Sequence, residues 1–287
     1  MKEKNNDIIL IPTDFSEVCD NAINFGAEIA KSLNYRVTVL HVVDKKTKTM
    51  LKKEDAGVEL VEQKLKEIKE KYESQYQVRV DTIFREGSIF EVIHKVAEEI
   101  KASLMVLGTH GKSGLQYLFG SFALRVVLES PVPVIVVQKR SFGKGFHEIV
   151  FPVSSDEEPR QKVGWAIFIS KLFKSRIHIF QALETDTGLN SRLQIITGQI
   201  TDTLVGQNVP YTIDVAAKTG DYAKQVIAKA AAIHADMIMI MTIPGMEVPG
   251  FSFTSWDETM MFNEAQIPVM CINPVILGGY YYDLPGM

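Results

Sequence analysis

Hydrophobic residues along the chain gather in short runs that alternate with longer, amphipathic segments. In the first half, five apolar runs have the length of strands and are too short to span a membrane. They lie at 8–12, 36–43, 76–84, 104–107 and 132–137. Between them, apolar residues recur every three or four positions, as on the buried face of a helix. The first half therefore predicts five strands and four helices in a doubly wound parallel sheet.

One segment of the first half lacks this periodicity. Residues 45–53 are rich in lysine and poor in hydrophobic side chains, so we expect a solvated loop there. The helix after it carries Val58, Leu65 and Tyr72 on one face, with glutamate and lysine on the other. This pattern favours a helix that covers the sheet over a helix that binds a partner.

The second half of the chain repeats the plan of the first. Pro12 and Pro152 stand at the same place in corresponding apolar runs, and residues 237–240 match 104–107. A self-similarity of this length indicates the tandem duplication of one domain. The expected domains are 1–140 and 146–287. The tyrosine-rich tail, 278–287, is expected to pack on a domain surface as a strap.

A glycine-rich loop follows the fourth strand. The loop contains Gly108, Gly111 and Gly120. Ser121 follows directly, and a helix is expected from Phe122 to Glu129. Glycines let backbone N–H groups approach an anion, and the first turn of a helix leaves N–H groups without partners. The arrangement predicts a phosphate site with Ser121 as the helix N-cap, and a plain connector is the alternative.

A carboxylate is expected beside this loop, because Asp14 lies at the carboxyl end of the first strand. A turn or capping role is the alternative for Asp14. The second half lacks both features: Ser154 or Ser155 aligns with Asp14, and Met241 aligns with Gly108. We therefore expect the second domain to carry a decayed site.

Composition and charge narrow the class of protein. Hydrophobic residues make up 46% of the 287 residues and charged residues 23%, as in globular proteins with an ample core. The net charge of −4 argues against nucleic acid as the main partner. No signal peptide is visible and no apolar run approaches the ~20 residues of a membrane helix, so no membrane association is expected. Cys19 and Cys271 lack metal-ligand spacing, which favours a reducing cytoplasm.

These motifs together resemble the universal stress protein family in its tandem two-domain form. The resemblance covers nearly the whole chain. It is stronger over residues 8–138 than over residues 148–275. It rests on the segments Ile11-Pro12-Thr13-Asp14-Phe15-Ser16, Leu40-His41-Val42, Gly108-Thr109-His110-Gly111, Gly120-Ser121 and Pro133-Val134. The nucleotide-binding branch of that family has Gly-x2-Gly-x9-Gly-(Ser/Thr), whereas this chain has eight residues between its second and third glycines.

The resemblance implies a fold and an assembly. Each domain would be a Rossmann-like, five-stranded parallel sheet of the type found in adenine nucleotide α-hydrolases. Family domains pair through the strand that corresponds to 132–137 here, so the two copies would form a pseudo-dimer within one chain. A further homodimer of two chains is left open.

The resemblance also implies a ligand. The first domain would bind ATP or another adenine nucleotide, and Mg²⁺ would accompany a triphosphate through its phosphate oxygens. Asp14 would contact the nucleoside, and the Val42 backbone would meet the adenine edge. The implied nucleotide-binding residues are Pro12, Thr13, Asp14, Val42, Leu107, Gly108, His110, Gly111, Gly120, Ser121 and Phe122.

An enzymatic role has little support in the sequence. It contains no Gly-x4-Gly-Lys-(Ser/Thr) P-loop and no histidine pair at metal or triad spacing. Three hypotheses follow. The protein is a stress-response sensor or regulator that binds an adenine nucleotide, a nucleotide-free scaffold that acts through protein–protein contacts, or a weak ATPase.

Overall fold

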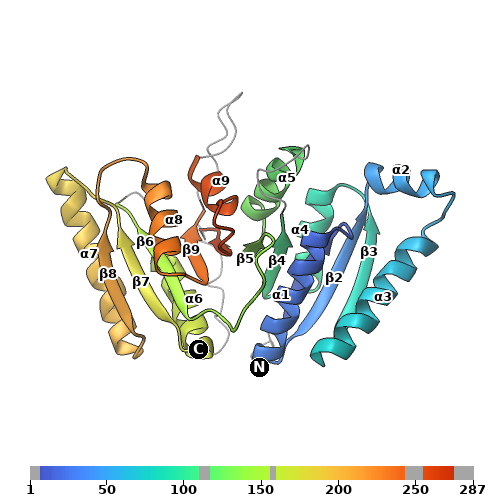
Figure 1. The fold of residues 1–287 in the computed structure, drawn as a ribbon, viewed down its shortest axis with the longest axis horizontal. Helices are drawn as coiled ribbons and strands as arrows, with labels where there is room; N and C mark the ends of the chain where they lie inside the picture. The colour runs from blue at the N-terminus through green and yellow to red at the C-terminus, as the bar shows by residue number, and fades with distance from the viewer. Residues whose placement is uncertain (1–6, 110–116, 156–159, 243–254, 275–287) are drawn as a thin grey trace. The chain divides into compact units, whose positions relative to one another are not determined.

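The computed structural model describes residues 7–109, 117–155, 160–242 and 255–274. His110, Gly111 and the predicted strap at 278–287 lie outside the described residues. The chain divides into two compact units, Met1–Phe142 and Gly143–Met287 (Figure 1). Each unit is an α/β structure in its own right.

The first unit is a five-stranded parallel sheet covered by helices on both faces. Its strands are β1 (Ile8–Thr13), β2 (Arg36–Val43), β3 (Val80–Glu86), β4 (Leu104–Gly108) and β5 (Val134–Val137). Its helices are α1 (Glu17–Leu33), α2 (Lys45–Lys53), α3 (Glu59–Tyr76), α4 (Ile89–Glu99) and α5 (Tyr117–Leu128). The strand order is β3-β2-β1-β4-β5, all parallel. Because crossovers are right-handed, the change of direction after β3 puts α1 and α3 on one face and α4 and α5 on the other.

The second unit has the same topology. Its strands are β6 (Glu148–Val153), β7 (Arg176–Gln181), β8 (Tyr211–Val215), β9 (Met237–Met241) and β10 (Val269–Ile272), in the order β10-β9-β6-β7-β8. Its helices are α6 (Arg160–Phe173), α7 (Thr187–Gly206), α8 (Tyr222–Ala232) and α9 (Ser255–Met261). The predicted doubly wound α/β fold is thus confirmed in both units, while the pseudo-dimer stays a prediction. In the described ranges no helix is long and apolar enough to cross a membrane.

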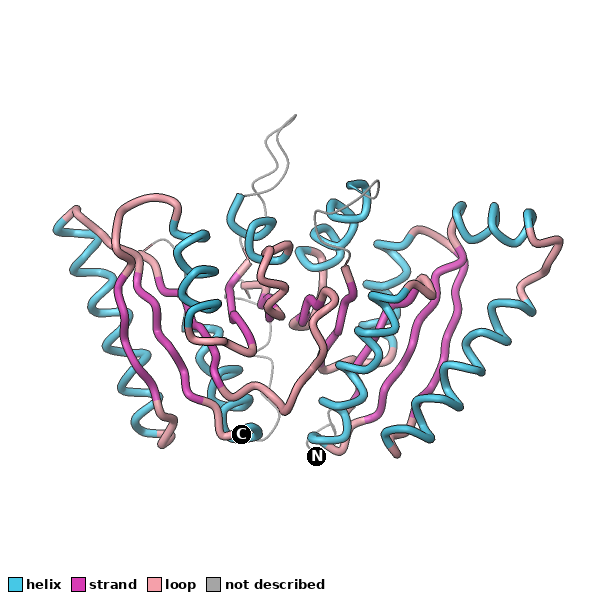
Figure 2. The backbone as a smooth tube through the Cα atoms, in the orientation of Figure 1, coloured by secondary structure: helices cyan, strands magenta, loops and turns pink. Residues whose placement is uncertain are grey.

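The prediction of a loop at 45–53 was wrong, because this segment forms the helix α2 (Figure 2). The Asp44 side chain caps the helix by accepting the Thr47 N–H at 2.8 Å. One turn apart, Thr47 and Leu51 are buried against the unit, while the lysines face solvent. Two inward side chains and a cap are enough to hold a short helix against a sheet. With so few inward residues, the hydrophobic periodicity of this segment is weak in the sequence.

The third strand starts at Val80, later than the predicted Tyr76, because α3 continues through Tyr76. Two tyrosines of α3 reach α1 and hold this last turn. The Tyr72 hydroxyl donates to Asp20 Oδ1 at 2.7 Å, and the Tyr76 hydroxyl donates to Asn24 Oδ1 at 2.9 Å. The two rings stack on each other with centroids 6.0 Å apart, so this end of the α1–α3 interface is closed.

The packing of α1 on β4 explains one of the glycines of the loop motif. A Cβ atom at Gly108 would lie 2.5 Å from the Val18 carbonyl oxygen and 3.1 Å from the Cys19 nitrogen, both in the first turn of α1. Backbone atoms of a helix cannot yield as a flexible side chain does. Gly108 is therefore required by close packing, whether or not a ligand binds beside it.

Gly108→Ala is expected to destabilise the protein by roughly 1–3 kcal/mol, because the added methyl group overlaps the α1 backbone. Urea unfolding followed by circular dichroism measures the change. Gly198→Ala is the matched control, since no heavy atom lies within 4 Å of its added Cβ in α7. This control should stabilise the helix by about 0.5–1 kcal/mol. A loss of stability of the same size in both variants would contradict the close approach at Gly108.

Candidate functional site

The carboxyl ends of β1, β2 and β4 meet at one edge of the first sheet. The chain leaves β1 toward one face and β4 toward the other, so these two neighbouring strands form the topological switch point of the sheet, where folds of this type have a crevice. This is the position at which open α/β sheets bind ligands. Six of the predicted residues lie at or directly after these strand ends: Pro12, Thr13, Asp14, Val42, Leu107 and Gly108.

The structure places each predicted residue as follows. Pro12 and Thr13 end β1 and Asp14 follows them, Val42 is in β2, and Leu107 and Gly108 end β4. The backbones of Gly120, Ser121 and Phe122 lie in α5, and His110 and Gly111 are outside the described residues. Thr13, Val42 and Leu107 are buried, whereas Asp14 is exposed.

The predicted start of the helix after the glycine loop was wrong. α5 begins at Tyr117, so Gly120 and Ser121 lie inside the helix, and Ser121 is not its N-cap. A glycine within a helix costs only about 1 kcal/mol, so a single glycine does not by itself end a helix. The N–H groups of the first turn of α5 therefore belong to residues 117–120.

A tight turn between β1 and α1 holds Asp14. Phe15 has a left-handed backbone with φ of 65°, and its N–H donates to Thr13 Oγ1 at 3.0 Å. The Ser16 N–H donates to Asp14 Oδ1 at 2.9 Å. These two bonds fix the carboxylate at the end of β1 with one oxygen turned to the α1 backbone.

The Asp14 carboxyl group stays ionised. Partial desolvation of the group acts to raise the pKa of Asp14, but hydrogen bonds from Ser16 and Cys19 outweigh it, and the charge of Lys46 adds to their effect. The net pKa lies below the ordinary value of an aspartate. An ionised carboxylate at the end of β1 is a strong acceptor for hydroxyl groups of a ligand.

His41 lies buried beneath this turn. Its Nδ1 lies 2.8 Å from the Thr13 carbonyl oxygen, and its Nε2 lies 3.2 Å from Thr47 Oγ1. The Phe15 ring stacks on the imidazole with centroids 4.3 Å apart. Burial lowers the pKa of His41 below its ordinary value near 6.5, against the opposing effect of the Thr13 hydrogen bond. The ring is therefore neutral at pH 7.

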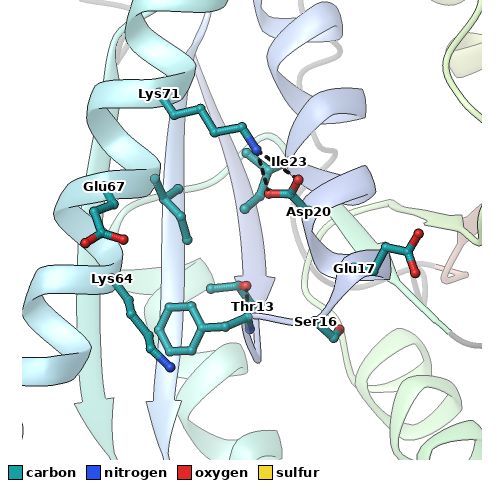
Figure 3. Close-up of a pocket in the computed structure, with 10 residues that line it drawn as sticks. Thr13, Ser16, Glu17, Asp20, Ile23, Lys64, Glu67 and Lys71 are labelled. Carbon is teal, nitrogen blue, oxygen red and sulfur yellow. Dashed lines mark hydrogen bonds and ion pairs between the residues drawn. The ribbon is translucent and has the colours of Figure 1, made fainter.

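A groove of about 430 Å³ lies next to the crevice, between α1 and α3 (Figure 3). Figure 3 shows Lys64, Glu67 and Lys71 along α3, facing Asp20 and Ile23 of α1. Lys71 and Asp20 bridge the groove with an ion pair of 3.0 Å. The sequence analysis missed this groove. Its only sequence signal is the spacing of the α3 residues, which places them on one helical face.

The Cys19 thiol is buried against Asp14. Burial raises the pKa of Cys19 to about 12, and the Asp14 charge acts in the same direction. Both cysteines are free and buried. Within the described ranges, no three side chains of histidine, cysteine, aspartate or glutamate come together as a metal site.

The corresponding edge of the second unit is covered by its own side chains. The Tyr222 hydroxyl accepts the Val153 N–H at 3.0 Å at the end of β6 and donates to the Phe180 carbonyl at the end of β7. The Tyr222 ring stacks between Phe180 and Trp256, with centroids 5.9 and 5.5 Å away. A fully buried lysine, Lys162, donates to the Pro152 carbonyl at 2.5 Å. This edge therefore presents aromatic rings and a buried amine instead of the Asp14 turn.

Comparison with known proteins identifies relatives of the first unit. A model of the universal stress protein family matches residues 5–138. A universal stress protein of Methanocaldococcus jannaschii is 37% identical over 139 residues, which cover 46% of this chain and 81% of that protein. A second one from the same organism is 29% identical over 157 residues, covering 46% of this chain and 95% of that protein.

A solved structure shares the fold along both units. The crystal structure of a universal stress protein from Archaeoglobus fulgidus covers 93% of this chain and 98% of its own, with a TM-score of 0.71. The two sequences are 18% identical, so this likeness concerns the fold alone.

The wild-type protein is expected to lose stability as the pH falls from about 6.5, because unfolded His41 binds a proton at its ordinary pKa and folded His41 only at lower pH. His41→Asn, which retains a donor for the Thr13 carbonyl, should show a smaller loss between pH 7 and pH 5. Urea unfolding at both pH values measures the two differences.

The matched control is His234→Asn. His234 is exposed and has a left-handed backbone with φ of 53°, a conformation that asparagine adopts readily. It should keep the pH dependence of the wild type. If His41→Asn loses as much stability between pH 7 and pH 5 as the wild type does, the claim that the folded protein keeps His41 neutral is wrong.

Proposed function

Since the chain belongs to the universal stress protein family, we propose that its first unit binds ATP or another adenine nucleotide and acts as a stress-response sensor or regulator. The ligand occupies the crevice at the carboxyl ends of β1, β2 and β4. The observation that carries the proposal is the Asp14 turn, which holds an ionised, exposed carboxylate where the strand order reverses.

Each side of the crevice suits one part of the nucleotide. The Asp14 carboxylate accepts hydrogen bonds from the ribose hydroxyls, framed by Pro12 and Thr13. Val42 at the end of β2 meets the adenine edge. The phosphates lie on the loop after Gly108 and at the first turn of α5, since the N–H groups of a first helical turn and the helix dipole favour negative charge.

The remaining predicted residues complete the phosphate side. These are Leu107, His110, Gly111, Gly120, Ser121 and Phe122. A triphosphate would bring Mg²⁺ coordinated by its own oxygens. Because α5 starts at Tyr117, the N–H groups offered to phosphate come from one turn earlier than the glycine motif suggests.

One nucleotide per chain is proposed, with the second unit as a structural partner. Tyr222 covers the ends of β6 and β7, and this half-buried side chain would have to move before a nucleoside could reach that edge. We further propose a cytoplasmic location, which two free, buried cysteines support.

A nucleotide-free scaffold is the second candidate function. It is favoured by the Gly108 contact, because packing against α1 accounts for this glycine without a phosphate. The spacing of Gly111 and Gly120, one residue shorter than in the nucleotide-binding branch, points the same way. The two candidates differ in whether the chain binds an adenine nucleotide at all.

Asp14→Asn is expected to weaken the binding of ATP and AMP by roughly 10- to 100-fold, as loss of hydrogen bonds to a charged group does. The asparagine oxygen can still accept the Ser16 N–H, so the turn is retained. Titration calorimetry measures affinity and stoichiometry, which should be one nucleotide per wild-type chain.

Asp202→Asn, an exposed change on α7, is the matched control and should bind as the wild type does. Two nucleotides per chain would contradict the single site. An absence of binding at millimolar ATP and AMP would leave the scaffold as the function. Hydrolysis above background that Asp14→Asn abolishes would instead indicate a weak ATPase.

A further inference from the structure

Three buried polar groups form a chain of hydrogen bonds beside the proposed adenine position. His41 and Thr47 are 4% and 8% exposed, so their polar atoms must find partners within the protein. The Thr47 hydroxyl has two acceptors within reach, His41 Nε2 at 3.2 Å and the Val42 carbonyl oxygen at 3.3 Å. Because the hydroxyl carries one proton, it serves one acceptor fully at a time.

The tautomer of His41 decides which acceptor receives that proton. The Thr13 carbonyl can only accept, so His41 Nδ1, 2.8 Å away, must carry a hydrogen. In the neutral ring Nε2 is then a bare acceptor, and the Thr47 hydroxyl turns toward it. Among the described residues the Val42 carbonyl accepts the Asp44 N–H at 3.0 Å, and a carbonyl has a second lone pair that either the Thr47 hydroxyl or a ligand can use.

We propose that neutral His41 is a specificity-determining positioning residue, which draws the Thr47 hydroxyl away from Val42 so that the Val42 carbonyl can accept the 6-amino group of an adenine. The inference rests on the proposed function. It adds selection of 6-amino over 6-oxo purines, because a 6-oxo group has no hydrogen to donate to that carbonyl.

Protonation of His41 reverses the arrangement. Nε2–H then donates to Thr47 Oγ1, the Thr47 hydroxyl turns to the Val42 carbonyl, and the second lone pair is taken. The charges that face the ring come from three segments. Asp14 after β1 and Asp44 before α2 favour the imidazolium, whereas Lys64 of α3 opposes it, and the Phe15 ring covers one face.

The test compares adenosine with inosine at pH 7.5 and pH 5.0 by titration calorimetry. Nucleosides are used because they carry no phosphate that titrates in this range. The wild type should bind adenosine about three- to tenfold more weakly at pH 5.0, the value of one hydrogen bond. The affinity of the wild type for inosine should not fall between pH 7.5 and pH 5.0.

Two variants should each lose the pH dependence but hold the affinity for adenosine at opposite ends of the wild-type range, which a merely structural role would not produce. His41→Asn keeps a donor for Thr13 but leaves the Thr47 proton to Val42, so adenosine should bind weakly at both pH values. Thr47→Val removes the competing donor, so adenosine should bind well at both. Thr49→Val is the control on the same helix, since the exposed Thr49 hydroxyl donates to the Lys45 carbonyl at 2.8 Å. It should behave as the wild type does.

The outcomes separate this inference from the proposed function. If adenosine and inosine bind with a ratio that does not change with pH, or if both variants shift affinity in the same direction, the role of His41 is overturned while nucleotide binding stands. If adenosine, AMP and ATP all fail to bind, the proposed function falls and this inference falls with it. A ¹⁵N NMR spectrum that shows hydrogen on Nε2 and not on Nδ1 of His41 at pH 7.5 would also overturn it.

Discussion

The close approach of the first turn of α1 to the end of β4 is the constraint on which the site depends. Gly108 lies against the backbone of Val18 and Cys19, where any side chain would overlap the helix. This contact sets how closely the first turn of α1, which follows the Asp14 turn, approaches the end of β4. A change at Gly108 would therefore alter the fold and the proposed site together.

Hydrogen bonds to a buried histidine join the other side of the same edge. His41 reaches the Thr13 carbonyl on β1 and the Thr47 hydroxyl on α2, and it supports the Phe15 ring of the Asp14 turn. Buried polar groups are costly unless every one is paired, so such a network tolerates few arrangements. The network positions the ends of β1 and β2 relative to each other, which is where the proposed nucleoside would bind.

The two units show how one fold can lose such an edge while it keeps its core. β6 and β7 pair as β1 and β2 do, yet Tyr222 covers their ends and stacks between Phe180 and Trp256. The sheet is held by buried apolar runs in both units, so side chains at its edge can change without loss of the topology. This is the physical basis for one proposed site in a chain of two units.

The sequence by itself determined the alternation of strands and helices, the repeat, and the position of Asp14 and Gly108 at strand ends, because periodicity and turn residues act locally. Only the tertiary structure decided the rest. α2 is a helix because Asp44 caps it and Leu51 packs inward, and α5 starts at Tyr117, before Gly120, because one glycine costs too little to end a helix. The pairing of His41 with Thr13 and Thr47 joins segments whose sequences show no sign of each other. Contacts between distant segments are set by how the elements pack, which no local pattern records.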